Sequence, residues 1–125
     1  MNCLIVDDSR IMRNIIKNSI INEGLKGFEF LEASDGREAL AIIQSNSVDV
    51  LLLDWNMPNL NGLELVKKLR KDPRYAALPI IMITSEAAKY NVIEAVKEGV
   101  TDYLLKPVSD RTLSEKLKTI LLGEN

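Results

Sequence analysis

The sequence of 125 residues contains no histidine and only one cysteine, Cys3. A single cysteine cannot form an internal disulfide, and its position in an apolar run is typical of a reducing compartment. Zinc and non-haem iron sites rely on histidine nitrogen and cysteine sulfur, which this chain nearly lacks. The composition therefore argues against metal centres of these two kinds.

The sequence also lacks a long apolar run, a signal peptide and an excess of positive charge. Its longest apolar stretches, such as 50–53 and 80–83, are far too short to cross a bilayer. The net charge of −2 produces no positive field that would attract nucleic acid or an anionic membrane surface. We therefore expect a cytoplasmic, monomeric protein of one domain, with neither nucleic acid nor membrane among its partners.

Five short segments rich in Val, Ile, Leu or aromatic residues are predicted to be strands. They are residues 3–6, 28–33, 48–53, 80–84 and 103–105. Several are continuously apolar, which is typical of parallel strands covered on both faces. Alternation of these strands with helical segments predicts an α/β fold in which helices cover both faces of a doubly wound parallel sheet.

Apolar residues recur at helical spacing between the strands. The predicted helices are residues 9–23, 35–45, 63–71, 92–98 and 110–122. In the first helix, one apolar stripe faces the core and a polar set faces away. The stripe is Met12, Ile15, Ile16 and Ile20, and the polar set is Arg13, Asn14, Lys17 and Asn18. Capping residues occur at the expected ends: Gly24 and Gly99 as C-caps, and Ser34 or Asp35 and Ser109 or Asp110 as N-caps.

Reactive side chains follow four of the five predicted strands. In a doubly wound sheet, ligands bind beyond the carboxyl ends of the strands, so these side chains are expected to meet at one edge. They are Asp7 and Asp8 after the first strand, Asp54 after the third, Thr84 and Ser85 around the end of the fourth, and Lys106 after the fifth.

The acidic members of this set predict a site for a hard cation. Close ionised carboxylates repel each other by roughly 4 kcal/mol per pair at an intermediate dielectric, so a cation or a proton must offset the repulsion. Oxygen-only ligands favour Mg²⁺ where phosphate is involved. Phosphoryl transfer needs positioning, a nucleophile and cations on the equatorial oxygens, and an aspartate nucleophile forms an acyl phosphate. The sequence therefore favours phosphoryl transfer to Asp54, with Lys106 as a second cation.

These residues and their neighbours resemble the receiver domain of bacterial two-component response regulators. The motifs that carry the resemblance are Asp7-Asp8, Asp54-Trp55-Asn56-Met57-Pro58, Gly62, Thr84-Ser85-Glu86 and Lys106-Pro107. The chain is most similar to the single-domain regulators of chemotaxis, through the motif that begins at Asp54 and the stretch Glu115-Lys116-Leu117. The resemblance implies a flavodoxin-like fold with five helices and strand order 2-1-3-4-5. It also implies that residues 1–125 form one receiver domain with no output domain.

The resemblance also implies a role for each site residue. Asp54 would be the phosphoacceptor, and Thr84 and Lys106 would contact phosphoryl oxygens. Mg²⁺ would be held by Asp8, by Asp54 and by the backbone carbonyl of Asn56, with Asp7 acting largely through water. Asn56 and Glu86 would influence dephosphorylation, and the peptide bond between Lys106 and Pro107 would be cis. Tyr103 would be the switch aromatic that becomes buried as Thr84 shifts, with Lys89 and Lys116 on a partner surface.

The resemblance makes the chain a signalling protein and not an enzyme, since it would catalyse only its own phosphorylation and dephosphorylation. The phosphodonor would be a sensor histidine kinase, which must act in trans because the chain has no histidine. The output would be a flagellar motor switch protein, and a phosphatase is a further partner to consider. The alternative within the family is a phosphorelay intermediate that passes its phosphoryl group to a histidine phosphotransfer protein.

Three readings from other classes are less well supported. A Mg²⁺-dependent phosphohydrolase with an aspartyl-phosphate intermediate usually has a second carboxylate two residues after the nucleophile, where this chain has Asn56. A flavodoxin-like cofactor binder would need hydroxyls after the first strand, where Asp7 and Asp8 would repel an FMN phosphate. A scaffold domain that is never phosphorylated generally lacks part of the acidic set, which is complete here.

Overall fold

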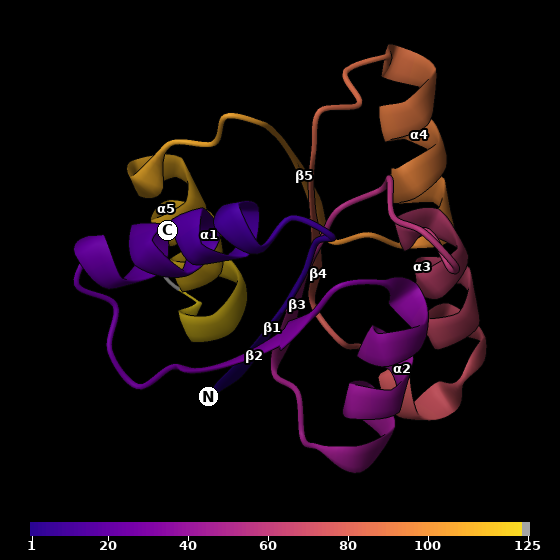
Figure 1. Ribbon diagram of the computed structural model, residues 1–125, viewed down its shortest axis with the longest axis horizontal. Helices are drawn as coiled ribbons and strands as arrows, with labels where there is room; N and C mark the ends of the chain where they lie inside the picture. The colour runs from indigo at the N-terminus through magenta and orange to yellow at the C-terminus, as the bar shows by residue number, and fades with distance from the viewer. Residues whose placement is uncertain (124–125) are drawn as a thin grey trace.

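A five-stranded parallel sheet in the order β2-β1-β3-β4-β5 forms the centre of the computed structural model, which describes residues 1–123 (Figure 1). The strands are β1 (Asn2–Val6), β2 (Glu29–Ala33), β3 (Val50–Leu53), β4 (Ile80–Thr84) and β5 (Asp102–Leu105). Every pair of neighbouring strands is parallel. The expected flavodoxin-like, doubly wound fold and its strand order are confirmed.

Helices cover both faces of the sheet (Figure 1). Helices α1 (Arg10–Asn22) and α5 (Asp110–Leu122) lie together on one face. Helices α2 (Gly36–Ser45), α3 (Gly62–Lys71) and α4 (Lys89–Glu98) lie on the other. Within the described part of the chain, no helix has both the length and the apolar character needed to cross a membrane.

The sheet divides the core into two layers. Strand residues alternate between them, so that Leu4 and Leu51 belong to the layer beneath α2, α3 and α4, while Ile5 and Leu52 belong to the layer beneath α1 and α5. Because each central strand is buried on both faces, both sets of alternate positions are apolar. This explains the continuous apolar runs of the sequence and holds the carboxyl ends of the strands at one rigid edge.

Strand β3 begins at Val50, two residues after the predicted start at 48, and two other local elements differ more from the predictions. Helix α4 begins at Lys89, three residues before the predicted start at 92. Its N-cap is Ala88, which makes no side-chain capping bond, so the sequence carries no capping signal there. A short 3-10 helix, η1 (Pro73–Tyr75), was not predicted; it begins after Asp72, whose side chain accepts from the amide of Arg74.

The alternatives for the helix caps are resolved by the structure. Asp35 and not Ser34 caps α2, and Ser109 and not Asp110 caps α5. Gly99 ends α4 in the left-handed conformation, as predicted. Helix α1 is capped at its C-terminus by Glu23, and Gly24 follows with a positive φ of 75°.

The amphipathic pattern of α1 is partly corrected. Ile16 and Ile20 are buried as predicted, whereas Ile15 is 47% exposed at the edge of the stripe. On the polar side, Arg13 and Lys17 pair with Glu32 of β2. This face of α1 therefore packs partly against the edge of the sheet through ion pairs.

Candidate functional site

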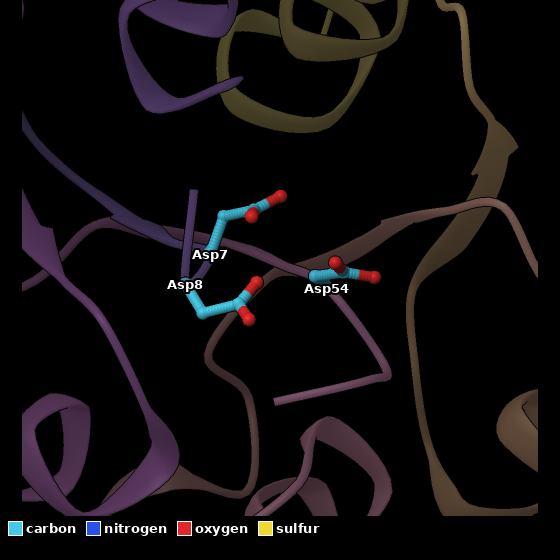
Figure 2. Close-up of side chains that lie close together, drawn as sticks. All are labelled: Asp7, Asp8 and Asp54. Carbon is cyan, nitrogen blue, oxygen red and sulfur yellow. The ribbon is translucent and has the colours of Figure 1, made fainter. Parts of the chain in front are cut away.

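The acidic residues lie at the carboxyl edge of the sheet because β1 and β3 are neighbours. The register pairs Val6 with Leu53, so Asp7 and Asp54, the next residues of each strand, are adjacent. The amide of Asp54 donates to the carbonyl of Val6 at 3.0 Å, which continues the ladder to this point. Figure 2 shows the side chains of Asp7, Asp8 and Asp54 close together.

These three carboxylates form a group that could hold a cation. One oxygen from each lies within 4.8 Å of the others; Asp7 and Asp54 are buried and Asp8 is exposed. All the donors are carboxylate oxygens, which suits a hard divalent cation such as Mg²⁺ and not a soft metal. The exposed carboxylate of Asp8 leaves the group accessible from solvent. The donor set therefore fits the magnesium expected from the sequence.

Lys106 bridges two of the carboxylates. Its ammonium nitrogen lies 2.7 Å from Oδ2 of Asp7 and 3.1 Å from Oδ2 of Asp54. Burial is the largest single influence on the pKa of Lys106 and lowers it, but the hydrogen bonds and charges of the two aspartates together raise that pKa above its ordinary value. Lys106 therefore stays protonated at neutral pH. The peptide bond between Lys106 and Pro107 is cis, as the resemblance implied.

The three aspartates are restrained to different degrees. The other carboxylate oxygen of Asp7 accepts from the amide of Ser9 at 2.9 Å, and that of Asp54 accepts from the amide of Trp55 at 2.7 Å. The side chain of Asp8 makes no hydrogen bond or ion pair with any residue of the described chain. Its oxygens are thus the most available to a cation.

Thr84, at the end of β4, is linked to the loop that precedes α4. Its side chain is fully buried and its hydroxyl oxygen accepts from the amide of Glu86 at 3.3 Å. The phenol of Tyr103, on β5, donates to the carbonyl of Glu86 at 2.6 Å. Burial, followed by the negative charges of Glu86 and Asp54, raises the pKa of Tyr103. The half-buried Tyr103 is therefore tied to the same loop as Thr84.

Asn56 connects the loop after β3 to the loop after β4. Its side-chain amide donates to one carboxylate oxygen of Glu86 at 2.5 Å, and Asn91 of α4 donates to the other at 3.3 Å. Asn56 is exposed, and Glu86 is half-buried. The structure thus brings together the two residues expected to influence dephosphorylation, by a direct hydrogen bond.

Gly62 allows the loop after β3 to fold back against Asp54. Its amide donates to the carbonyl of Trp55 at 2.8 Å. A Cβ at this position would lie 2.1 Å from the carbonyl oxygen of Asp54, a separation that no side chain tolerates. The glycine of the sequence motif is therefore required by a close approach of two backbone segments.

Two predicted residues lie outside this cluster, and one contact was missed. Lys89 is exposed at the start of α4, and Lys116 of α5 pairs with Asp102 at 3.1 Å. The missed residue is Arg13, which donates to the backbone carbonyl of Asp7 at 2.6 Å. No motif singled out Arg13, because its importance depends on which strand end lies beside the helix.

Comparison with known proteins identifies a family. The family model described as response regulator receiver domain matches residues 3–118. A chemotaxis protein CheY1 of Helicobacter pylori is 48% identical over 126 residues, which cover 100% of this chain and 99% of that protein. A chemotaxis protein CheY homolog of Campylobacter jejuni is 48% identical over 122 residues, 97% of this chain and 92% of the relative.

Solved structures with the same fold include further receiver domains. The receiver domain of the Francisella response regulator 1452 matches with a TM-score of 0.86 at 34% identity, covering 98% of this chain and 97% of that one. The Vibrio cholerae chemotaxis protein CheY4 matches with a TM-score of 0.85 at 37% identity, covering 96% of this chain and 98% of that one. The fold and the sequence thus lead to the same group of proteins.

Proposed function

We propose, because this chain belongs to the family of response regulator receiver domains, that it accepts a phosphoryl group on Asp54 and then changes a protein-binding surface. The chain is CheY-like over its whole length, and two-component signalling is the process to which such domains belong. The phosphodonor would be the phosphohistidine of a sensor histidine kinase. In this proposal the chain catalyses only its own phosphorylation and dephosphorylation.

The observation that carries the proposal is the position of Lys106 between Asp7 and Asp54. Two buried carboxylates and one ammonium share a site that is open to solvent on the side of Asp8. An isolated structural ion pair needs one carboxylate, whereas this site has an excess of negative charge. That excess supports a site that also accommodates a divalent cation.

Mg²⁺ would be held by Asp8, by Asp54 and by the backbone carbonyl of Asn56, with Asp7 acting through water. The direct role of Asp8 agrees with the restraints on the side chains, since Asp8 accepts no hydrogen bond from the described chain, whereas Asp7 and Asp54 each accept two. Bound there, Mg²⁺ would offset the charge on the phosphoryl oxygens during transfer.

The proposed reaction forms a bond between a carboxylate oxygen of Asp54 and phosphorus. The bond between phosphorus and the donor imidazole nitrogen breaks, and the imidazole leaves with the electron pair. Lys106, released from Asp54, pairs with one oxygen of the transferred group. The hydroxyl of Thr84 accepts from Glu86 but donates no bond within residues 1–123, so its hydrogen is available to a second phosphoryl oxygen. Water later hydrolyses the acyl phosphate, at a rate that Asn56 and Glu86 influence.

The switch would act through the loop that contains Thr84 and Glu86. If Thr84 moves toward the phosphoryl group, its bond to the amide of Glu86 changes, and Glu86 also holds Tyr103. Two arrangements of this loop would then differ in the packing of Tyr103 and the start of α4. Phosphorylation is thereby coupled to the outer face of α4 and β5.

That outer face has the character of a partner surface. It exposes large apolar side chains, flanked by Lys89 at the start of α4 and Lys116 on α5. The exposed side chains are Tyr90, Ile93, Val96 and Leu105, each at least 46% accessible. The names of its relatives support chemotaxis as the proposed output. The proposed partner is a flagellar motor switch protein, with a phosphatase as a further partner.

Intact mass spectrometry tests the chemistry. The protein is incubated with Mg²⁺ and a small acyl-phosphate donor, and we expect the mass to increase by one phosphoryl group. Asp54→Asn should abolish the adduct, whereas the matched control Asp49→Asn, which precedes the same strand at its opposite end, should retain it. No adduct on the wild-type protein, or an adduct that survives Asp54→Asn, would refute the proposal.

An affinity experiment tests the output. Protein loaded with Mg²⁺ and beryllofluoride, a phosphoryl mimic, is compared with the apo protein in a pull-down from native lysate. Enrichment of a flagellar switch component only in the loaded state supports the motor assignment. Recovery of a histidine phosphotransfer protein in its place would mean that the chain is a phosphorelay intermediate.

A further inference from the structure

Arg13 of α1 reaches the backbone at the end of β1. Its Nη1 donates to the carbonyl oxygen of Asp7 at 2.6 Å, and its Nε donates to a carboxylate oxygen of Glu32 at 2.9 Å. Only 15% of the Arg13 side chain is exposed. The guanidinium group therefore joins α1 and the edge strand β2 to the first residue of the acidic group.

The contact on Asp7 is made to the main chain and not to the carboxylate. Both carboxylate oxygens of Asp7 are already occupied by the amide of Ser9 and the ammonium of Lys106, and its own amide donates to the carbonyl of Ala33 at 3.1 Å. With Arg13, every polar group of Asp7 has a partner. Asp7 is thus a fixed point at the sheet edge.

The carbonyl of Asp7 and the amide of Asp8 belong to one planar peptide unit. A donor that holds this carbonyl also fixes the orientation of the peptide that leads into Asp8. The side chain of Asp8 makes no hydrogen bond or ion pair of its own with the described residues. No other side chain of the described residues therefore restrains the Asp8 carboxylate through a hydrogen bond or ion pair, and its placement depends on a backbone that the hydrogen bond from Arg13 restrains.

We propose that Arg13 is a positioning residue for the cation site: Arg13 holds the Asp7–Asp8 peptide so that the Asp8 carboxylate faces Asp54. The inference rests on the proposed function, since it assumes that the acidic group binds Mg²⁺. Arg13 touches neither the cation nor the phosphoryl group in this scheme. Partners that orient metal ligands from outside the coordination sphere commonly change metal affinity by about 10-fold to 100-fold when they are removed.

Glu32 keeps the guanidinium in place for this task. One of its oxygens accepts from Arg13, and the other lies 3.3 Å from the ammonium of Lys17, one helical turn further along α1. Lys17 carries the same charge and shares the same partner, but within residues 1–123 it makes no hydrogen bond or ion pair with Asp7. It is therefore a matched control that separates positioning from the loss of a positive charge near the acidic group.

The test compares the Mg²⁺ affinities of Arg13→Met and Lys17→Met. Each affinity is measured by titration with Mg²⁺, with the fluorescence of Trp55 as the signal. Trp55 is the only tryptophan, and its amide donates to Asp54, so the signal reports on the site itself. We expect Arg13→Met to weaken Mg²⁺ binding about 10-fold, and Lys17→Met to stay within about twofold of the wild type. Glu32→Gln, which keeps the guanidinium but loosens its anchor, should weaken binding in the same direction and by less.

Amide hydrogen exchange of the metal-free proteins provides a second measurement. The amide of Ser9, which donates to the carboxylate of Asp7, should exchange faster in Arg13→Met than in Lys17→Met, because only the first substitution releases the Asp7–Asp8 peptide. If Arg13→Met does not fold, the Mg²⁺ affinities of Glu32→Gln and Lys17→Met are compared to test the inference. Equal Mg²⁺ affinity in the Arg13 (or Glu32) and Lys17 variants overturns the inference alone. A wild-type protein that binds no Mg²⁺ overturns the proposed function together with it.

Discussion

The ammonium group of Lys106 lies 2.7 Å from a carboxylate oxygen of Asp7, although the two residues are 99 positions apart in the sequence. They follow β5 and β1, which are not neighbours, since β3 and β4 lie between them in the sheet. The long lysine side chain spans this gap across the carboxyl edge. One ion pair thus connects segments near both ends of the chain at the candidate site.

Lys106→Met should destabilise the metal-free protein by about 3 kcal/mol, because removal of one partner leaves buried charges uncompensated. Addition of Mg²⁺ should restore part of this loss. Urea unfolding with and without Mg²⁺ measures both effects. The control Lys116→Met, which breaks a more exposed pair with Asp102, should cost no more than about 1 kcal/mol.

The same comparison has an expected pH dependence. The pKa of Lys106 is raised in the folded protein, so its stabilising contribution is fully present below the ordinary lysine pKa and is lost as the pH rises through the folded pKa. The difference between the wild type and Lys106→Met should therefore stay constant through neutral pH and shrink only above about pH 10. A difference that disappears near neutral pH would contradict this assignment.

Gly62→Ala should destabilise the protein by about 3 kcal/mol or more, because the added Cβ would collide with the backbone of Asp54. Gly27→Ala is the control: nothing lies within 4 Å of its Cβ position, and only its positive φ of 84° makes alanine unfavourable. That strain costs about 1–2 kcal/mol. Thermal unfolding of both variants tests whether Gly62→Ala loses more stability than Gly27→Ala. An equal loss would show that the close approach at Gly62 is unimportant.

Asp35→Ala should cost about 1 kcal/mol at neutral pH, because Asp35 caps α2 by accepting from the amide of Glu38. That hydrogen bond, followed by the one from Asn59, lowers the pKa of Asp35. Its contribution is therefore present above the ordinary aspartate pKa near 4 and is lost as the pH falls through the lower folded value. The unfolding free energies of the two proteins should differ at neutral pH and converge in acid, well below the ordinary aspartate pKa. A difference that persists in acid would argue against capping by the carboxylate.

Tyr103→Phe removes the donor that holds the carbonyl of Glu86. The expected cost is about 1 kcal/mol, since a partly buried carbonyl loses its partner. Amide exchange in the loop between Thr84 and α4 should increase. Tyr90→Phe, on a side chain that is 73% exposed, should leave both quantities unchanged. Unaltered amide exchange in Tyr103→Phe would show that Tyr103 does not restrain this loop, and the proposed switch would lose its basis.

Much of the fold could be predicted from the sequence, because strands that are buried on both faces of the sheet consist of consecutive apolar residues. The four residues of β3, Val50–Leu53, are all buried and all apolar, and β4 is buried throughout. Where local signals are weak the boundaries were wrong, as at α4, which follows the uncapped Ala88. Helix starts with a capping side chain, such as Ser109, were placed to within a residue.

The candidate site was predictable for the same reason. The carboxyl ends of parallel strands meet at one edge, so Asp7, Asp54 and Lys106 had to converge once the strands were recognised. Their individual restraints were not predictable. The bond between Asn56 and Glu86, for example, joins loops that are 30 residues apart.

The sequence by itself determined the strands, the order of secondary structure and the set of chemical groups at the sheet edge, because periodicity and composition are local properties of the chain. Tertiary structure alone decided which groups restrain one another. In the sequence, Arg13 is one charged residue on the polar side of a helix. Only the packing of α1 beside β1 and β2 places its guanidinium on the carbonyl of Asp7. Such contacts depend on distances between segments remote in sequence, which no local pattern encodes.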